Sequence, residues 1–138
     1  MRQGLLIAAI LLFSSSLASA DSQGDPRLDY ILQCQGCHQP DGSGAEALGV
    51  PRMTGFVGRF LAIEGGRAYL VQVPGVAQSL LGDQAIAELL NWLLVRFSPN
   101  ELPEPFTPYT KQEVARYRAR TPIDAVETRA ALVAAMKD

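Results

Sequence analysis

Histidine and cysteine are scarce in this chain of 138 residues, which contains one histidine and two cysteines. A structural zinc site takes four ligands, and these three side chains do not supply them. Strand signals and internal repeats are absent as well. We therefore expect an all-α protein without a structural zinc ion.

The chain also lacks an apolar run long enough to span a membrane. Residues 5–13 are apolar, but these nine residues fall well short of the ~20 that a membrane-spanning helix needs. Arg2 precedes the run, and the small residues Ala18, Ser19 and Ala20 follow it, which is typical of a cleavable export signal. We therefore expect a signal peptide at residues 1–20 and a periplasmic mature chain with no membrane span.

A strong excess of charge of either sign is absent too. The chain has 12 basic and 14 acidic residues, and losing Arg2 with the signal makes the mature protein slightly more acidic. An acidic surface repels nucleic acid and anionic lipid, so we expect neither as a partner. Arg116, Arg118 and Arg120 form a local basic group, which we interpret as a solvated helix surface.

Both cysteines and the histidine fall within five residues, where Cys34, Cys37 and His38 form a Cys-x-x-Cys-His motif. This is the signature of c-type haem attachment, in which two thiols form thioethers and the adjacent imidazole binds the iron. We expect haem c, bound covalently by Cys34 and Cys37, with His38 as the proximal iron ligand. A thioredoxin-like redox pair is disfavoured because a strand should precede it, and a disulfide would explain neither His38 nor the export signal.

Helix start and stop signals divide the first part of the mature chain. Asp25 followed by proline predicts a first helix that leads into the motif. Residues 39–50 are rich in Gly, Pro, Asp and Ser, which indicates a loop. We expect a short helix at residues 67–73 and a long, mostly buried helix at residues 83–97.

The last part of the chain has helix signals of its own. Four prolines within residues 98–108 predict an extended strap. Thr110 opens a capping box and Asp124 caps a further helix, so the segment is patterned for order. We expect a haem domain at residues 21–98 and a helical extension at residues 99–138. The extension either docks a partner or covers apolar surface, and we favour docking, with the strap as a spacer.

Residues 25–97 resemble the class I c-type cytochromes, which are small single-haem electron carriers. Besides the haem motif, residues 51–59 read PRMTGFVGR, which looks like the Pro-x-Leu-x-Gly-x-x-Gly-Arg stretch of that family. The resemblance implies helices wrapped round one haem and a hydrogen bond from His38 to the Pro51 carbonyl, which orients the ring. It also implies that Tyr30 and Trp92 mark the crossing of the first and last cytochrome helices.

The sequence departs from this family at the sixth iron ligand. The Met-Pro step expected before the last cytochrome helix reads Val73-Pro74, and valine has no lone pair for iron. Met53 and Met136 are the methionines of the mature chain. Met53 matches a leucine that packs on the histidine side of the haem, and Met136 lies near the C-terminus. Two possibilities therefore stay open: one of these methionines is the distal ligand, or the distal site has no protein ligand.

These features predict a periplasmic one-electron carrier that accepts electrons from a dehydrogenase and passes them to a downstream cytochrome or oxidase. It would not be an enzyme. One alternative is a haem protein whose open distal site binds or senses a small ligand. Arg59 or Arg67 could act over the iron in that case, although each is more simply interpreted as a haem-propionate partner. Another alternative is the cytochrome subunit of a larger dehydrogenase.

Overall fold

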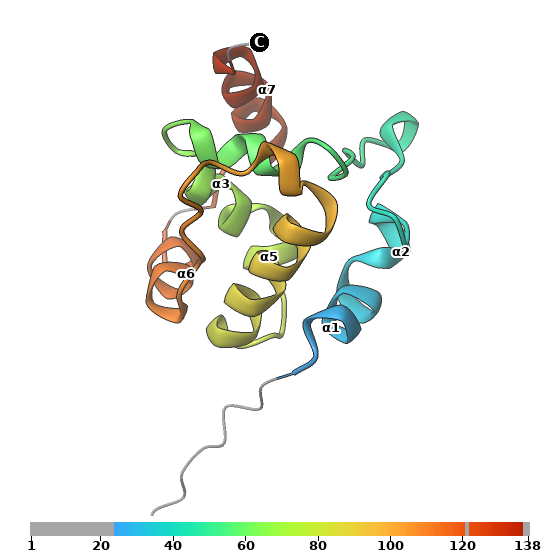
Figure 1. Ribbon diagram of the computed structural model, residues 1–138, viewed down its shortest axis with the longest axis vertical. Coiled ribbons are helices and arrows are strands. Elements are labelled where there is room, and N and C mark those ends of the chain that lie inside the picture. The colour runs from blue at the N-terminus through green and yellow to red at the C-terminus, as the bar shows by residue number, and fades with distance from the viewer. Residues whose placement is uncertain (1–23, 121, 137–138) are drawn as a thin grey trace, which may run out of the picture.

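The computed structural model describes residues 24–120 and 122–136, and the expected signal peptide lies outside them. The described residues form helices joined by loops, without a strand among them (Figure 1). A single isolated bridge pairs Ala45 with Val50. The expected all-α class is therefore confirmed. Over the described ranges, no helix is both long and apolar enough to cross a membrane.

Two helices carry the Cys-x-x-Cys-His motif. α1 (Pro26–Gln33) begins at the predicted cap, where the Asp25 carboxylate accepts a hydrogen bond from the Arg27 amide. α2 (Gln35–His38) follows directly, and Cys34 is the residue that joins the two helices. The motif therefore lies on a helical turn, as the sequence predicts.

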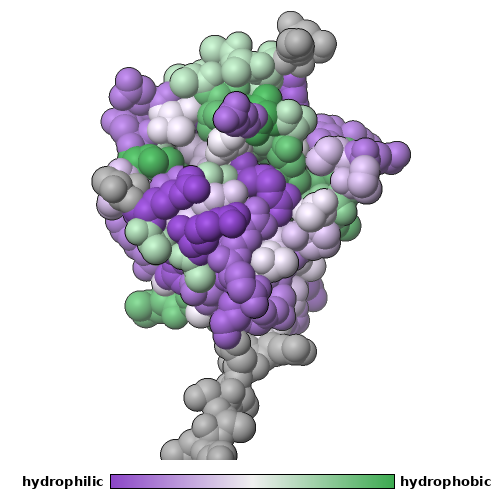
Figure 2. Space-filling view, turned by 90° about the vertical axis from the view of Figure 1, so that its left-hand side faces the viewer, coloured by the Kyte–Doolittle hydropathy of each residue, from purple (hydrophilic) through white to green (hydrophobic). Residues whose placement is uncertain are grey.

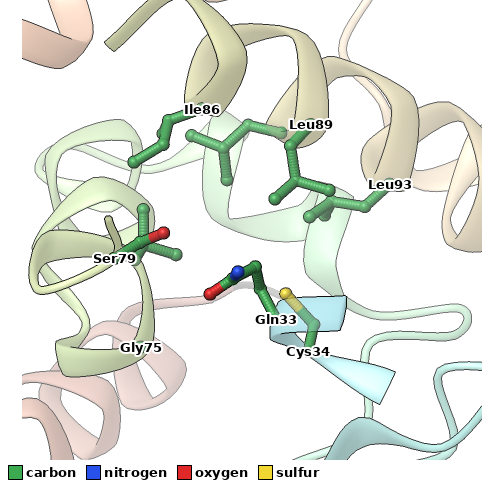
Figure 3. A pocket seen from close by; sticks show the side chains of 9 residues that line it. Gln33, Cys34, Gly75, Ser79, Ile86, Leu89 and Leu93 are labelled. Atoms are coloured by element: carbon green, nitrogen blue, oxygen red, sulfur yellow. The ribbon is translucent and has the colours of Figure 1, made fainter. Parts of the chain in front are cut away.

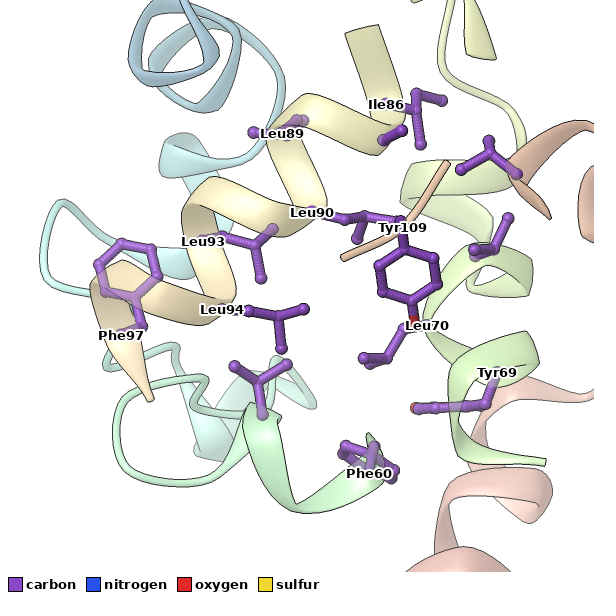
Figure 4. Packing of buried hydrophobic residues seen from close by; sticks show 14 of the residues in the cluster. Phe60, Tyr69, Leu70, Ile86, Leu89, Leu90, Leu93, Leu94, Phe97 and Tyr109 are labelled. Atoms are coloured by element: carbon purple, nitrogen blue, oxygen red, sulfur yellow. The ribbon is translucent and has the colours of Figure 1, made fainter. Parts of the chain in front are cut away.

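The long helix α5 (Asp83–Phe97) forms the centre of the hydrophobic core, as its broad apolar stripe predicts. Tyr30 of α1 packs on it, with its ring centroid 5.5 Å from that of Trp92 and 5.1 Å from that of Phe97. The predicted aromatic crossing is therefore confirmed. Figure 4 shows the core that α5 shares with other segments, which includes Phe60, Tyr69, Leu70, Leu90, Leu94 and Tyr109.

Short helices connect the motif to α5. The predicted loop at residues 39–50 contains one 3-10 turn, η1 (Glu46–Leu48), and a second 3-10 segment, η2 (Val57–Ala62), follows it. The predicted helix at residues 67–73 is α3 (Gly66–Gln72), which faces α5 across the core (Figure 4). α4 (Pro74–Ala77) comes next and leads into the irregular segment before α5.

The residues after α5 pack back onto this helix. A 3-10 turn, η3 (Pro99–Glu101), leads into the proline-rich strap, and α6 (Lys111–Arg118) then packs on α5 and α3. Tyr109 of the strap and Val114 of α6 are 3% and 0% exposed, so both belong to the core. The interpretation of the strap as a spacer is therefore wrong for α6, because the strap brings this helix into the core.

Hydrogen bonds join the strap to the rest of the core. The Asn91 side chain accepts a bond from the Tyr109 amide at 2.7 Å and donates one to the Tyr109 carbonyl at 3.0 Å. The fully buried Ser98 hydroxyl accepts from the Gly58 amide at 3.0 Å and donates to Glu101 at 2.7 Å. Buried polar groups at this junction are therefore satisfied by residues from both sides of it.

The last helix, α7 (Ala125–Ala135), lies further out. It begins at the predicted cap Asp124, whose carboxylate accepts bonds from the amides of Val126 and Glu127. It packs against α3, and none of its residues is fully buried. Figure 2 looks at the side of the molecule where α6 lies and shows a mainly hydrophilic surface with scattered apolar patches. On this side, α6 therefore contributes core side chains beneath a polar exterior.

Candidate functional site

The two thiols and the imidazole project from one turn of the chain. The Cys34 amide donates to the Tyr30 carbonyl at 2.9 Å, and the amides of Cys37 and His38 both donate to the Cys34 carbonyl. No disulfide joins the two described cysteines, and Cys37 is exposed while Cys34 is partly buried. Burial raises the pKa of the Cys34 thiol, and the nearby Asp29 carboxylate raises it further. Both effects favour the uncharged form of this sulfur.

His38 is placed so that one ring nitrogen is occupied. Its Nδ1 atom lies 3.2 Å from the Pro51 carbonyl oxygen. A carbonyl only accepts, so this bond requires the proton on Nδ1 and leaves the lone pair of Nε2 available in the neutral ring. Burial lowers the pKa of His38, while the bond to Pro51 opposes part of that change. The ring is thus held in the form that binds a metal.

Two contacts position the chain on either side of His38. The Tyr30 hydroxyl donates to the carbonyl of Gln39 at 2.6 Å, which fastens the end of α2 to α1. The Gly44 amide donates to the His38 carbonyl at 3.1 Å, which closes the turn that follows. Burial raises the pKa of Tyr30 to about 12, so its hydroxyl remains a donor across the physiological range.

Gly44 is a functional position that sequence reasoning missed. Its φ is +70°, and a Cβ atom there would lie 2.6 Å from the Val50 carbonyl oxygen and 2.7 Å from that of Pro51. Only glycine allows the turn after His38 to pass so close to the carbonyl that His38 uses. In the sequence, Gly44 is one of several glycines in a predicted loop, and no local signal separates it from the others.

A mainly apolar pocket opens beside Cys34, and the sulfur of this residue points toward it (Figure 3). α5 forms one wall, while α4 and the segment after it form the opposite wall. The lining residues are Gln33, Cys34, Gly75, Val76, Ser79, Ile86, Leu89, Leu90 and Leu93. The apolar lining beside a thiol suits one edge of a covalently attached haem, and His38 is not among the residues that line this small pocket.

Comparisons with known proteins agree with this fit. No protein-family model matches the chain. It is 33% identical over 133 aligned positions to a cytochrome c-552 of Thermus thermophilus, an alignment that covers 83% of this chain and 86% of the relative. The chain belongs to the c-type cytochromes. A second Thermus thermophilus cytochrome c-552 is 34% identical over 106 positions, covering 64% of this chain and 80% of that relative.

As a small c-type cytochrome, the protein carries haem c and is an electron-transfer protein. The cytochrome fold and the haem that the sequence predicts are thereby confirmed. The roles of the individual site residues stay predictions, because neither the relatives nor the fold shows which atom binds the haem or its iron.

The side of this cytochrome that faces Cys34 across the pocket offers few groups that bind iron. Residues 73–82 contain neither a sulfur atom nor an imidazole. Met53 and Met136 are both partly buried and pack against the hydrophobic core, and neither lines the pocket beside Cys34. Met53 thus lies in the environment expected for a core thioether, and the distal ligand stays a prediction.

Two arginines make contacts that the sequence does not predict. Arg67 donates to both carboxylate oxygens of Glu113, at 2.8 and 2.7 Å, and to the carbonyl of Thr107 at 2.8 Å. Its guanidinium therefore binds the C-terminal extension, and its expected contact with a haem propionate stays a prediction. Arg118 is directed into the molecule and is not part of a solvated basic surface. Arg59 lies over the Phe56 ring at 5.5 Å, and its relation to the haem stays a prediction.

Proposed function

We propose that this chain is a periplasmic one-electron carrier in which Cys34 and Cys37 attach haem c and His38 binds its iron. Electrons would come from a dehydrogenase and pass to a downstream cytochrome or oxidase. Residues 21–98 would contain the haem-binding part, and residues 99–138 would form the extension. When bound, haem c supplies the one-electron chemistry, so the protein needs no group that transforms a substrate.

The observation that carries the proposal is the pairing of His38 with the Pro51 carbonyl on the same turn as the Cys34 and Cys37 sulfurs. The 3.2 Å contact directs the proton to Nδ1 and leaves Nε2 as a ligand atom. Hydrogen bonding of Nδ1 also raises the basicity of the ring and favours iron(III) over iron(II). The chain therefore sets part of the reduction potential through one backbone carbonyl.

Cys34 and Cys37 have a different role from His38. Cys34 opens onto the apolar pocket, whereas Cys37 is exposed at the edge of the site. Two thioethers from one turn would hold the haem with one edge inside and one edge near the surface. An edge near the surface suits a carrier whose encounters with partners are brief and small in area.

The attachment is tested by extraction of the pigment into acidic organic solvent. We expect the wild-type haem to resist extraction and the double variant Cys34→Ala/Cys37→Ala to lose it. We expect His38→Ala to prevent stable maturation, because the iron loses its ligand. Leu48→Ala, at a residue 83% exposed in the loop after the motif, serves as the control and should keep its haem. Extractable haem in the wild-type protein would contradict the proposal.

The carrier role itself is tested with a partner. Stopped-flow mixing with a periplasmic dehydrogenase from the same cell should reduce the haem in a single one-electron phase. Fractionation of the cells should place the mature chain in the periplasm. A chain that copurifies quantitatively with a dehydrogenase would instead be its fixed cytochrome subunit.

A second function is favoured by the composition of residues 73–82. This segment presents no sulfur or imidazole where the family has its methionine, so the haem would keep one open position that binds or senses a small neutral ligand. Reduced protein with an open site should bind carbon monoxide rapidly, with a shift of its absorption bands. If carbon monoxide does not change the reduced spectrum, this second function is rejected and electron transfer remains the proposed function.

A further inference from the structure

Arg118 of α6 forms a cluster of hydrogen bonds with one short segment. Its Nη1 atom donates to the Leu81 carbonyl at 3.0 Å and to the Asp83 carboxylate at 2.8 Å. Its Nη2 atom donates to the Ser79 carbonyl at 2.8 Å, and Nε and Nη2 both lie 3.3 Å from the Ala77 carbonyl. One guanidinium thus binds three backbone carbonyls and a carboxylate within seven consecutive residues.

These carbonyls belong to a stretch that has little regular structure of its own. α4 ends at residue 77 and α5 begins at residue 83. Between them, the Ser79 amide bonds the Val76 carbonyl at 3.2 Å, and the Leu81 amide bonds the Ser79 hydroxyl at 3.2 Å. Leu80, at the middle of the segment, is 99% exposed and contributes no core packing. Arg118 therefore supplies much of the order in this segment.

This stretch and α4 before it form one wall of the pocket beside Cys34, and Ser79 is the residue of the stretch itself that lines it. Gly75, Val76 and Ser79 line that pocket, opposite the leucines of α5 (Figure 3). Arg118 binds the carbonyl of Ser79 and that of Ala77, the residue after Val76. The C-terminal extension is thus connected to the pocket wall through a side chain that is not itself one of the residues lining the pocket.

A second tether of α6 provides a comparison. Arg67 of α3 binds Glu113 of α6 with two hydrogen bonds of 2.8 and 2.7 Å, and these residues lie outside the pocket lining. Loss of either tether would loosen α6, but only loss of the Arg118 tether would free the pocket wall. The two arginines therefore separate a general effect on stability from a specific effect on the pocket.

We infer that Arg118 positions residues 77–82, and with them the wall that Ser79 forms beside Cys34, and thereby limits the access of small ligands to the iron. The inference rests on the proposed attachment of haem at Cys34 and Cys37. The planar guanidinium of Arg118 bonds three carbonyls and a carboxylate at the same time. A lysine ammonium cannot reproduce this set of bonds. A role of the extension follows: it holds the segment that comes directly after the Val73-Pro74 step, where the family resemblance places the missing iron ligand.

The test compares Arg118→Gln, Arg118→Lys and Arg67→Gln in the full haem protein. Hydrogen exchange of the amides at residues 77–81 reports the order of the wall, and the rate of carbon monoxide association with the reduced protein reports access. We expect Arg118→Gln to speed exchange at these amides by at least about tenfold and to speed carbon monoxide association. Arg67→Gln should lower the melting temperature without either change. Arg118→Lys, which keeps the charge opposite Asp83, should resemble Arg118→Gln.

Other outcomes overturn the inference. If Arg118→Gln leaves both rates unchanged, or if Arg67→Gln alters them equally, Arg118 is only a tether for α6. If Arg118→Lys behaves as the wild type, the ion pair with Asp83 is sufficient and the carbonyl bonds do not position the wall. Failure of the haem attachment is recognised separately by extraction of the pigment, and the exchange rates test the wall in either case.

Discussion

At the scale of single residues, the conformation of Gly44 controls the acceptor that orients His38. Its backbone is left-handed, and a Cβ atom there would lie 2.6 Å from the Val50 carbonyl oxygen and 2.7 Å from that of Pro51. Gly49 is a natural comparison, because it is also left-handed, with φ of +77°, but a Cβ atom there would meet nothing within 4 Å. Substitutions at these two glycines therefore separate the effect of backbone strain from the effect of steric contact with the site.

We expect Gly44→Ala to destabilise the protein by more than Gly49→Ala. Both variants carry the backbone cost of about 1–2 kcal/mol, but only Gly44→Ala must also displace the Pro51 carbonyl. That displacement weakens the His38 bond, so the reduction potential should shift in Gly44→Ala alone. Thermal unfolding and a redox titration measure the two effects. Equal losses of stability with no difference in potential would show that Pro51 is not disturbed.

Met53 is the other residue whose role a single substitution decides. It packs against the hydrophobic core and does not line the pocket beside Cys34. Met53→Leu conserves volume and should cost less than about 1.5 kcal/mol, with the haem spectrum nearly unchanged. The oxidised absorption spectrum is the measurement, with Met136→Leu as its partner variant. If a deep-red band is present and disappears in either variant, that methionine binds the iron.

At the scale of secondary-structure elements, α6 is bound at both ends by arginine. Arg67 connects its first turn to α3 through Glu113, and Arg118 connects its last turn to the segment before α5. The Arg67 guanidinium also lies over the Tyr109 ring at 4.2 Å, which adds an aromatic contact in the strap. Strap, α3 and α6 therefore meet around one side chain.

The Arg67 pair makes stability depend on pH. Hydrogen bonds from Arg67 lower the pKa of the Glu113 carboxyl below its ordinary value of 4.5, although desolvation opposes the change. Because the pKa is lowered in the folded state, this stability is present above pH 4.5 and is lost as pH falls through the folded pKa. We expect Glu113→Gln to lose about 1–2 kcal/mol at pH 7 and less near pH 3.

Urea unfolding at both pH values measures this difference. The double variant Arg67→Gln/Glu113→Gln completes a double-mutant cycle. In the Arg67→Gln background, the loss of stability caused by Glu113→Gln should no longer depend on pH. A loss that is the same at pH 7 and pH 3 would indicate that Glu113 acts by packing and not through its charge.

At the scale of the whole molecule, residues 99–120 belong to the same core as the cytochrome part. Tyr109 and Val114 are buried among residues of α3 and α5, and the outer face over α6 is mainly hydrophilic (Figure 2). These contacts favour a structural role for this stretch over the docking role that the sequence suggested. α7 packs more loosely, since none of its residues is fully buried.

Truncation at two points should distinguish the parts of the extension. A chain that ends at Phe97 loses the burial of Tyr109 and Val114, each worth about 1.5–3 kcal/mol, and should be severely destabilised. A chain that ends at Arg120 keeps the strap and α6 and should unfold only slightly earlier than the wild type. Melting curves measure stability, and stopped-flow reduction by the donor measures docking. If the chain that ends at Phe97 stays stable but is reduced slowly, the extension serves docking after all.

The sequence by itself determined the features that depend on near neighbours. The haem motif spans five residues, and the caps at Asp25, Thr110 and Asp124 each bind an amide two or three residues away, so local chemistry was sufficient. The apolar stripe of α5 likewise follows from helical periodicity alone.

Only the tertiary structure decided the partners that lie far apart in the chain. Asn91 binds a residue 18 positions away, Arg118 reaches back by 35 to 41 positions and Arg67 reaches forward by 46. Arg116, Arg118 and Arg120 look alike in the sequence, but Arg118 bonds Asp83 while Arg116 and Arg120 both lie over the Tyr117 ring. A polar side chain can bond any complementary group within reach, and which group comes within reach depends on how the whole core packs.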